Sequence, residues 1–133
     1  TGEKDGDTTP VTHFALIFSL LRLGDTSARR FANLIESIKE TLHQHLPIVG
    51  RGLLFGSQAR GNAHAGSDWD ILIILDKPKV EQSDHDNIAF PFTMLGWELG
   101  EAIIPVIYTR EEWANSSFMP FYKNVERDKI ILQ

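Results

Sequence analysis

The chain contains no cysteine among its 133 residues, which excludes disulfide bonds, thiolate catalysis and cysteine-based zinc sites. Positive charge is also scarce, since 13 lysine and arginine residues stand against 18 aspartate and glutamate residues, for a net charge of −5. Affinity for nucleic acid comes mainly from Lys and Arg side chains on phosphates. We therefore do not expect nucleic acid as the main partner. The absence of cysteine is compatible with a cytoplasmic location.

Long hydrophobic runs are missing as well. The main apolar stretch, residues 14–23, is shorter than the roughly 20 residues that a membrane-spanning helix needs, so we expect no membrane association. Polar residues dominate positions 1–10, which we expect to form a flexible segment. Because 42% of the chain is apolar, residues 11–133 can bury a core, and their length fits one domain.

The first half of the chain shows helical patterns followed by a strand. Residues 11–23 are apolar enough for one helix. A second helix is predicted to begin near residues 25–27 and to end before Pro47, because apolar residues recur at helical spacing at Phe31, Leu34, Ile35, Ile38 and Leu42. Residues 51–55 predict a short strand, and residues 56–61 a turn or a one-turn helix.

The second half alternates strands and helices. Beyond Asp70, residues 68–75 are apolar at every position, which is typical of a central strand buried on both faces. We expect a helix over 83–100, in which Pro91 either introduces a kink or starts a new helix. Pro105 places the next strand, residues 102–108, at a sheet edge or a bulge. Shorter elements follow: a helix that starts over 110–114, a helix or turn over 119–127, and a short edge strand over 130–132.

Asp68 and Asp70 are the most informative polar residues of the chain. Side chains alternate along a strand, so two aspartates one residue apart point to the same face. Carboxylates that close repel each other unless a cation stands between them. Oxygen ligands suit Mg²⁺, which binds through one or two carboxylates together with substrate phosphates. The pair therefore predicts a magnesium site at the beginning of a core strand.

Gly56 and Ser57 directly follow the strand over 51–55. Glycine lets a backbone approach a phosphate closely, and amides at the start of a helix favour anions. If the two strands are neighbours, this phosphate cradle meets the carboxylates. Arg60 on the same turn either reaches the β- and γ-phosphates or is a solvated surface residue. Ser67 either caps the strand or touches a phosphate.

The motif Gly56-Ser57, ten residues, Asp68-Trp69-Asp70 resembles the signature of minimal nucleotidyltransferases in the DNA polymerase β-like superfamily. The flanking residues 53–61 and 66–75 also resemble this family. The similarity is close over about residues 50–76 and looser to about residue 127.

This resemblance implies an α+β nucleotidyltransferase fold, a small mixed sheet flanked by helices. It implies that Asp68 and Asp70 are catalytic and bind two Mg²⁺ ions. Gly56, Ser57, Arg60 and Ser67 then contact ATP or another nucleoside triphosphate. Some relatives are antitoxins that place AMP groups on a small helical toxin of the HEPN type, so a partner of that kind is one expectation.

One family feature is missing. The family usually supplies a third carboxylate on the next strand, and the expected position falls near Val106, which is apolar. Glu101 is the nearest acid upstream, and it serves as a third acid only if the strand bulges around Pro105. Two functions therefore stay open: transfer of AMP from ATP to an acceptor hydroxyl, and a nucleotide- or protein-binding module without turnover.

Two further expectations concern aromatic residues. Trp69 alternates with the two aspartates, so we expect it to point into the core. The C-terminal part is rich in aromatic residues, which we expect to close the sheet, with a partner or homo-oligomer surface as the alternative: Trp113, Phe118, Phe121 and Tyr122.

Overall fold

The computed structural model describes residues 26–47 and 49–133. They belong to two units, one ending at Ile38 and one over Lys39–Gln133, which we describe separately. The helix expected over 11–23 and the segment 1–10 lie outside the described residues. In the part of the chain that the structure describes, no helix is long and apolar enough to cross a membrane.

Helix α2 spans Thr26–His45 and runs from the first unit into the second. It ends before Pro47, as predicted, and its buried positions recur at helical spacing: Leu34, Ile35, Ile38 and Leu42. In the second unit, a side-chain carbon on Gly52 would overlap the side chain of Leu42. Glycine at this position therefore lets the end of α2 pack directly on strand β1 (Arg51–Phe55).

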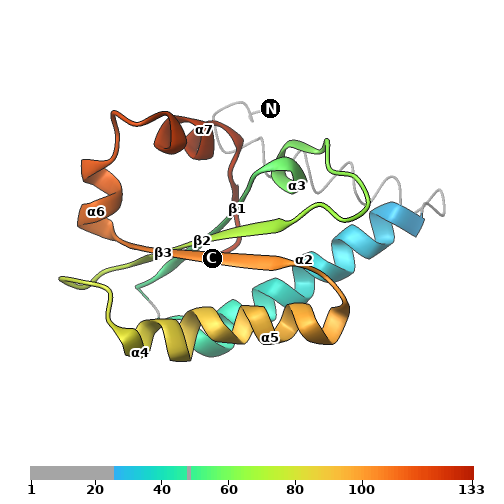
Figure 1. Cartoon of the computed structure of the whole chain (residues 1–133), viewed down its shortest axis with the longest axis horizontal. Coiled ribbons are helices and arrows are strands. Elements are labelled where there is room, and N and C mark those ends of the chain that lie inside the picture. Colours follow the sequence, from blue (N-terminus) through green and yellow to red (C-terminus); the bar gives the residue numbers. More distant parts are fainter. Residues whose placement is uncertain (1–25, 48) are drawn as a thin grey trace, which may run out of the picture. The chain divides into compact units, whose positions relative to one another are not determined.

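Four strands form one mixed sheet in the order β3-β2-β1-β4 (Figure 1). Strand β2 (Trp69–Leu75) pairs in parallel with β3 (Ile103–Thr109) and antiparallel with β1, and β4 (Ile130–Ile131) pairs antiparallel with β1. The predicted small mixed sheet with flanking helices is confirmed. The pairing of β3 with β2 continues through Pro105, so the edge position, and not a bulge, accommodates the proline.

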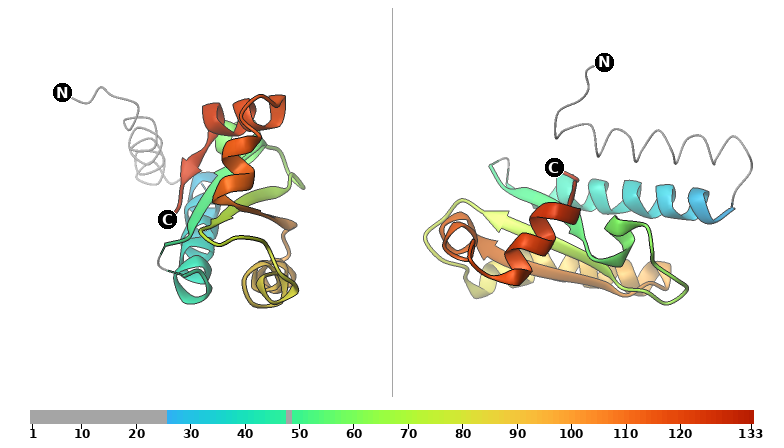
Figure 2. Two further views of the ribbon diagram at one scale, coloured as in Figure 1. Left: turned by 90° about the vertical axis from the view of Figure 1, so that its left-hand side faces the viewer. Right: turned by 90° about the horizontal axis from the view of Figure 1, so that it is seen from above.

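Helices cover both faces of this sheet, as Figure 1 and Figure 2 show. On one face, α4 (Gln82–Asp84) leads through a π-helical turn, His85–Ala89, into α5 (Phe90–Leu99). Pro91 lies in the first turn of α5, which confirms that a new helix starts there. The physical reason is that proline lacks an N–H and its ring would clash with a carbonyl of a preceding α-helical turn.

The other face carries α6 (Arg110–Asn115) and α7 (Pro120–Asp128), which enclose a buried cluster with the sheet. Its members are Leu53, Leu72, Ile74, Trp113 and Val125. The Trp113 ring lies 4.7 Å from Tyr122 and 5.9 Å from Phe121 between centroids. These three aromatic residues close the sheet as predicted, whereas Phe118 is 75% exposed and does not.

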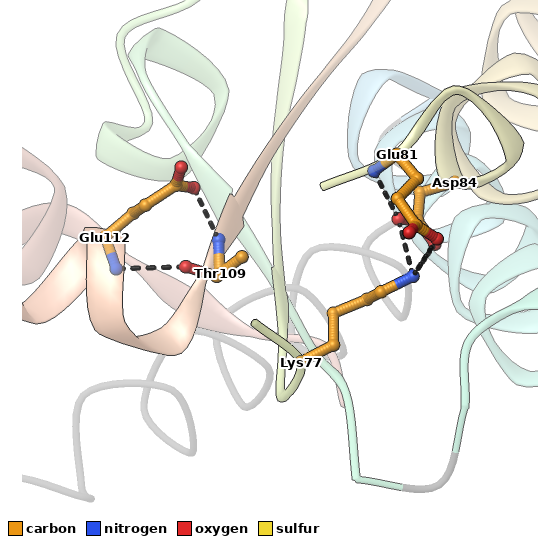
Figure 3. Close-up of polar contacts among 5 residues, drawn as sticks. All are labelled: Lys77, Glu81, Asp84, Thr109 and Glu112. Carbon is orange, nitrogen blue, oxygen red and sulfur yellow. Dashed lines mark hydrogen bonds and ion pairs between the residues drawn. The ribbon is translucent and has the colours of Figure 1, made fainter. Parts of the chain in front are cut away.

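Two polar clusters hold the segments that follow β2 and β3 (Figure 3). After β2, Lys77 Nζ lies 2.9 Å from a carboxylate oxygen of Asp84, which also accepts the Glu81 backbone N–H at 2.8 Å. After β3, Thr109 and Glu112 form a reciprocal capping box, with hydrogen bonds of 2.9 and 3.0 Å. Both clusters fix how the chain leaves the sheet at the end opposite to Asp68 and Asp70.

Candidate nucleotide site

The end of β1 and the beginning of β2 lie side by side. Phe55 pairs with Asp70 across the antiparallel ladder, so Gly56 follows next to this carboxylate. Gly56 has φ +79°, and a side-chain carbon there would collide with Oδ2 of Asp70. Only glycine fits this conformation and this space. The two strands are neighbours, which was the condition for this meeting, and the structure brings Gly56 and Asp70 together.

Asp68 and Asp70 differ in environment. Asp68 is exposed and comes before the first residue of β2, whereas Asp70 is half-buried within the strand. Burial and the neighbouring Asp68 charge raise the pKa of Asp70, and the positive charge of Arg60 opposes this rise. The two carboxylates and the guanidinium therefore share one electrostatic neighbourhood.

Trp69, between the two aspartates, is buried as predicted, at 3% exposure. Its indole N–H donates to Glu101 at 3.2 Å. Because strand side chains alternate, Trp69 and the Glu101 carboxylate that it binds lie away from the face of Asp70. Glu101 is therefore engaged in a contact that does not bring it to the aspartate pair.

Ser57 begins the one-turn helix α3 (Ser57–Arg60), which confirms the turn predicted over 56–61. The Gly56 carbonyl accepts the backbone N–H groups of Ala59 and Arg60 at 3.1 and 3.0 Å. Gly61 ends the helix with φ +81°. Arg60 is the last residue of this turn, its side chain lines a pocket together with Gly56, and its positive charge acts on the Asp70 carboxylate.

The loop between α3 and β2 is closed by Ser67. Its hydroxyl accepts the His64 backbone N–H at 2.9 Å, and its own N–H donates to the His64 carbonyl at 2.9 Å. These bonds shape the loop directly before Asp68. They leave the hydroxyl proton of Ser67 available to an incoming acceptor, since the oxygen acts here as an acceptor.

An open pocket of about 200 Å³ adjoins Gly56. Its lining comes from the end of β1, from α3 and from α7: Phe55, Gly56, Arg60, Phe121, Asn124, Val125 and Asp128. The Phe55 and Phe121 rings meet edge to face at 5.5 Å between centroids. One wall is thus aromatic, and the other carries the Arg60 guanidinium and the Asp128 carboxylate.

The neighbouring strand β3 supplies no acid to this face. Ile104 lies beside Asp70 in the parallel register, and Val106 lies beside Leu72. Within residues 26–47 and 49–133, no group of three or more His, Cys, Asp or Glu side chains is placed to hold a metal ion. On this face of β2, the side chains that could bind a metal ion are therefore Asp68 and Asp70.

The sequence did not indicate Asp128 or Asn124 as site residues. Asp128 lies 68 positions after Arg60, yet the two side chains approach to 3.4 Å. An acid at the end of a predicted helix has many surface roles, and only the packing of α7 beside α3 gives it this one. No local pattern would have identified it.

Comparison with known proteins agrees with this geometry. Residues 35–129 match the sequence model of the nucleotidyltransferase domain family. The solved structures that match include a crystal structure of a toxin–antitoxin with AMP-PNP, at 19% identity and a TM-score of 0.55, over 74% of this chain and 72% of that chain. No curated protein sequence matches significantly. The chain therefore belongs to the nucleotidyltransferase domain family.

Proposed function

We propose that the protein is a Mg²⁺-dependent nucleotidyltransferase that moves a nucleoside monophosphate, AMP from ATP, to an acceptor hydroxyl. The observation that carries this proposal is the meeting of Gly56, Asp70 and Arg60 at one end of the sheet. A phosphate cradle, a carboxylate pair and a cation are the parts that nucleotidyl transfer needs, because this chemistry depends on positioning and electrostatics.

The proposal includes two Mg²⁺ ions, for which the aspartate pair supplies the protein oxygens. Burial first and the Asp68 charge second raise the pKa of Asp70, and a cation between the two carboxylates would relieve the repulsion. Asp68 and Asp70 would hold the ions, and phosphate oxygens and water would complete the coordination, as Mg²⁺ allows. Bound ions would neutralise the triphosphate and lower the barrier to attack by the acceptor hydroxyl.

The other site residues hold the substrate in this proposal. The backbone of Gly56 and the Ser57 residue that begins α3 receive the triphosphate, and the Ser67 hydroxyl donates to it from the facing loop. Arg60 contributes a permanent positive charge toward the β- and γ-phosphates. Neutralising the negative charge of these phosphates favours the departure of pyrophosphate, the leaving group of the reaction.

The acceptor we favour is a hydroxyl on a partner protein. The toxin–antitoxin neighbour of similar fold motivates this choice, and a small helical partner of the HEPN type is the specific candidate. We place the reaction in the cytoplasm, in keeping with ATP as donor and with a chain that has no cysteine.

A second candidate function is favoured by one observation. Ile104, which is apolar, lies beside Asp70 where an acid from β3 would face the aspartates, and Val106 follows beside Leu72. A chain without that acid can bind a nucleotide or a protein partner and not turn the nucleotide over. This version keeps the Mg²⁺ and triphosphate site and omits the transfer step.

Incubation with ATP labelled with ³²P at the α-phosphate tests the proposal. The full chain is combined with Mg²⁺ and the product of its neighbouring gene, and protein-bound label is measured. We expect label on the partner with the wild type and none with Asp70→Asn. ATP binding, measured by calorimetry, without any label would select the second candidate. The absence of Mg²⁺-dependent ATP binding would overturn the transferase and the nucleotide-binding module, and would leave only a protein-binding module.

A further inference from the structure

Asp128 is the last residue of α7 and lies at the rim of the pocket beside Gly56. Only 10% of its side chain is exposed. Two arginines meet its carboxylate: Arg127 from the preceding position and Arg60 from α3. This nearly buried carboxylate thus links α3 to α7 at the edge of the proposed phosphate site, and its position there calls for an explanation.

The two arginines bind Asp128 unequally. Arg127 donates through Nε at 2.8 Å and through a terminal nitrogen at 3.0 Å, which is the fork geometry of a strong arginine–carboxylate pair. Arg60 donates once, at 3.4 Å. Arg127 thus keeps the carboxylate oriented, and Arg60 is held by the weaker of the two contacts.

The Arg60 guanidinium contacts the Asp128 carboxylate at 3.4 Å, and both residues line the pocket beside Gly56. An arginine side chain in water samples many rotamers, and fixing it costs on the order of 2 kcal/mol of side-chain entropy. A carboxylate that restricts this freedom before a ligand arrives reduces that cost at the moment of binding.

We propose that Asp128 is a positioning residue that holds Arg60 at the rim of the site, oriented toward the β- and γ-phosphates of a bound nucleoside triphosphate. This inference rests on the proposed function, because it requires a triphosphate beside Gly56. The single long contact from Arg60 leaves most of its donors open to phosphate oxygens. Asp128 therefore orients the guanidinium and does not sequester it.

The test is a double-mutant cycle on the full chain, read by calorimetric titration of ATP and of AMP in Mg²⁺. Arg60→Gln is expected to weaken ATP binding about tenfold or more, the equivalent of one charge-assisted hydrogen bond to phosphate. Asp128→Asn is expected to weaken it about threefold to tenfold when Arg60 is present and to add nothing when Arg60 is already Gln. AMP, which lacks the β- and γ-phosphates, should bind all variants alike.

Two controls separate positioning from a structural role. Asp76→Asn removes the carboxylate of another arginine pair, with Arg110 at 3.6 Å, and should leave ATP affinity unchanged. Asp128→Glu keeps the charge and should restore most of the affinity. Thermal unfolding of each variant shows whether it is folded. If Asp128→Asn loses stability, Arg60→Gln removes the same contact at its more exposed partner, and the ATP affinity of that variant tests the contact instead.

Several results would overturn the inference. Unchanged or tighter ATP binding by Asp128→Asn would mean that the carboxylate is idle or sequesters Arg60. An equal loss in the Arg60→Gln background, or an equal loss for AMP, would mean that Asp128 acts through the fold. If the wild type binds no ATP in Mg²⁺, the proposed function itself falls, and that outcome is distinct from normal wild-type binding with a silent Asp128.

Discussion

Replacing Asp70 by asparagine should stabilise the metal-free protein. The half-buried carboxylate has a raised pKa because of burial and the adjacent Asp68 charge. When the pKa of a group is raised in the folded state, its contribution to the free energy of unfolding is fully present below the unfolded pKa. That contribution is lost as the pH rises through the folded pKa. At pH 7 the ionised Asp70 therefore opposes folding, and Asp70→Asn removes this effect with almost no change in shape.

The magnitude follows from the partial exposure of the site. Solvent screens the repulsion, so we expect about 0.5 kcal/mol, within the range measured for exposed charge pairs. For a chain of this length that corresponds to a rise of about 2 °C in the unfolding temperature. Differential scanning calorimetry in EDTA at pH 7 measures it, and the difference should vanish near pH 3, where the wild-type carboxyl is protonated in both states.

Adding Mg²⁺ should reverse the order of the two proteins. A cation held by Asp68 and Asp70 binds the folded wild type and raises its unfolding temperature by mass action, whereas Asp70→Asn has lost a ligand and gains less. A lower unfolding temperature for Asp70→Asn in EDTA at pH 7 would refute the reasoning. It would mean that the carboxylate is stabilised by contacts stronger than the repulsion from Asp68.

Three further predictions concern the frame around the site. Gly56→Ala should destabilise the fold by roughly 1–3 kcal/mol in urea unfolding, because φ is +79° and the added carbon meets a carboxylate; an unchanged midpoint would contradict the geometry. Thr109→Ala should cost about 1 kcal/mol through loss of the α6 capping box with Glu112, and Thr109→Ser should recover most of it. Asp84→Asn should destabilise the protein at pH 7. Although burial opposes it, the Glu81 N–H and Lys77 lower the pKa of Asp84, so its contribution is present above the unfolded pKa and is lost as the pH falls through the folded pKa. Equal loss of unfolding free energy at pH 7 and below pH 3 would contradict that ion-pair account.

Much of the fold follows from local patterns in the sequence. The strand over 51–55 and the central strand after Asp68 were predicted because a short apolar run between turn residues is typical of a buried strand. Pro105 predicted an edge position or a bulge, since proline cannot donate within a sheet, and the edge position is confirmed. The helix boundary at Pro91 was predicted only as one of two outcomes. The local sequence does not say that the preceding turn, His85–Ala89, adopts the wider π-helical form.

The candidate site likewise has features that the local sequence predicts and features that depend on long-range packing. The neighbourhood of Gly56 and Asp70 could be predicted on the condition that the two strands pair, because consecutive strands that pair antiparallel bring the end of one to the start of the next. The partnership of Arg60 with Asp128 could not, because it depends on how α7 packs against the sheet. Nor could the register that sets Ile104, and not Val106, directly beside Asp70. Register and helix docking arise from long-range packing, which local periodicity does not encode.

The central claim is that Asp68 and Asp70 bind a nucleoside triphosphate through Mg²⁺. Calorimetric titration of ATP into the full chain, once with Mg²⁺ and once with EDTA, tests it most directly. The account predicts saturable binding with Mg²⁺, none or far weaker binding with EDTA, and a matching loss for Asp70→Asn in Mg²⁺. Equal affinity with and without the cation, or an Asp70→Asn variant that binds ATP as the wild type does, would contradict it.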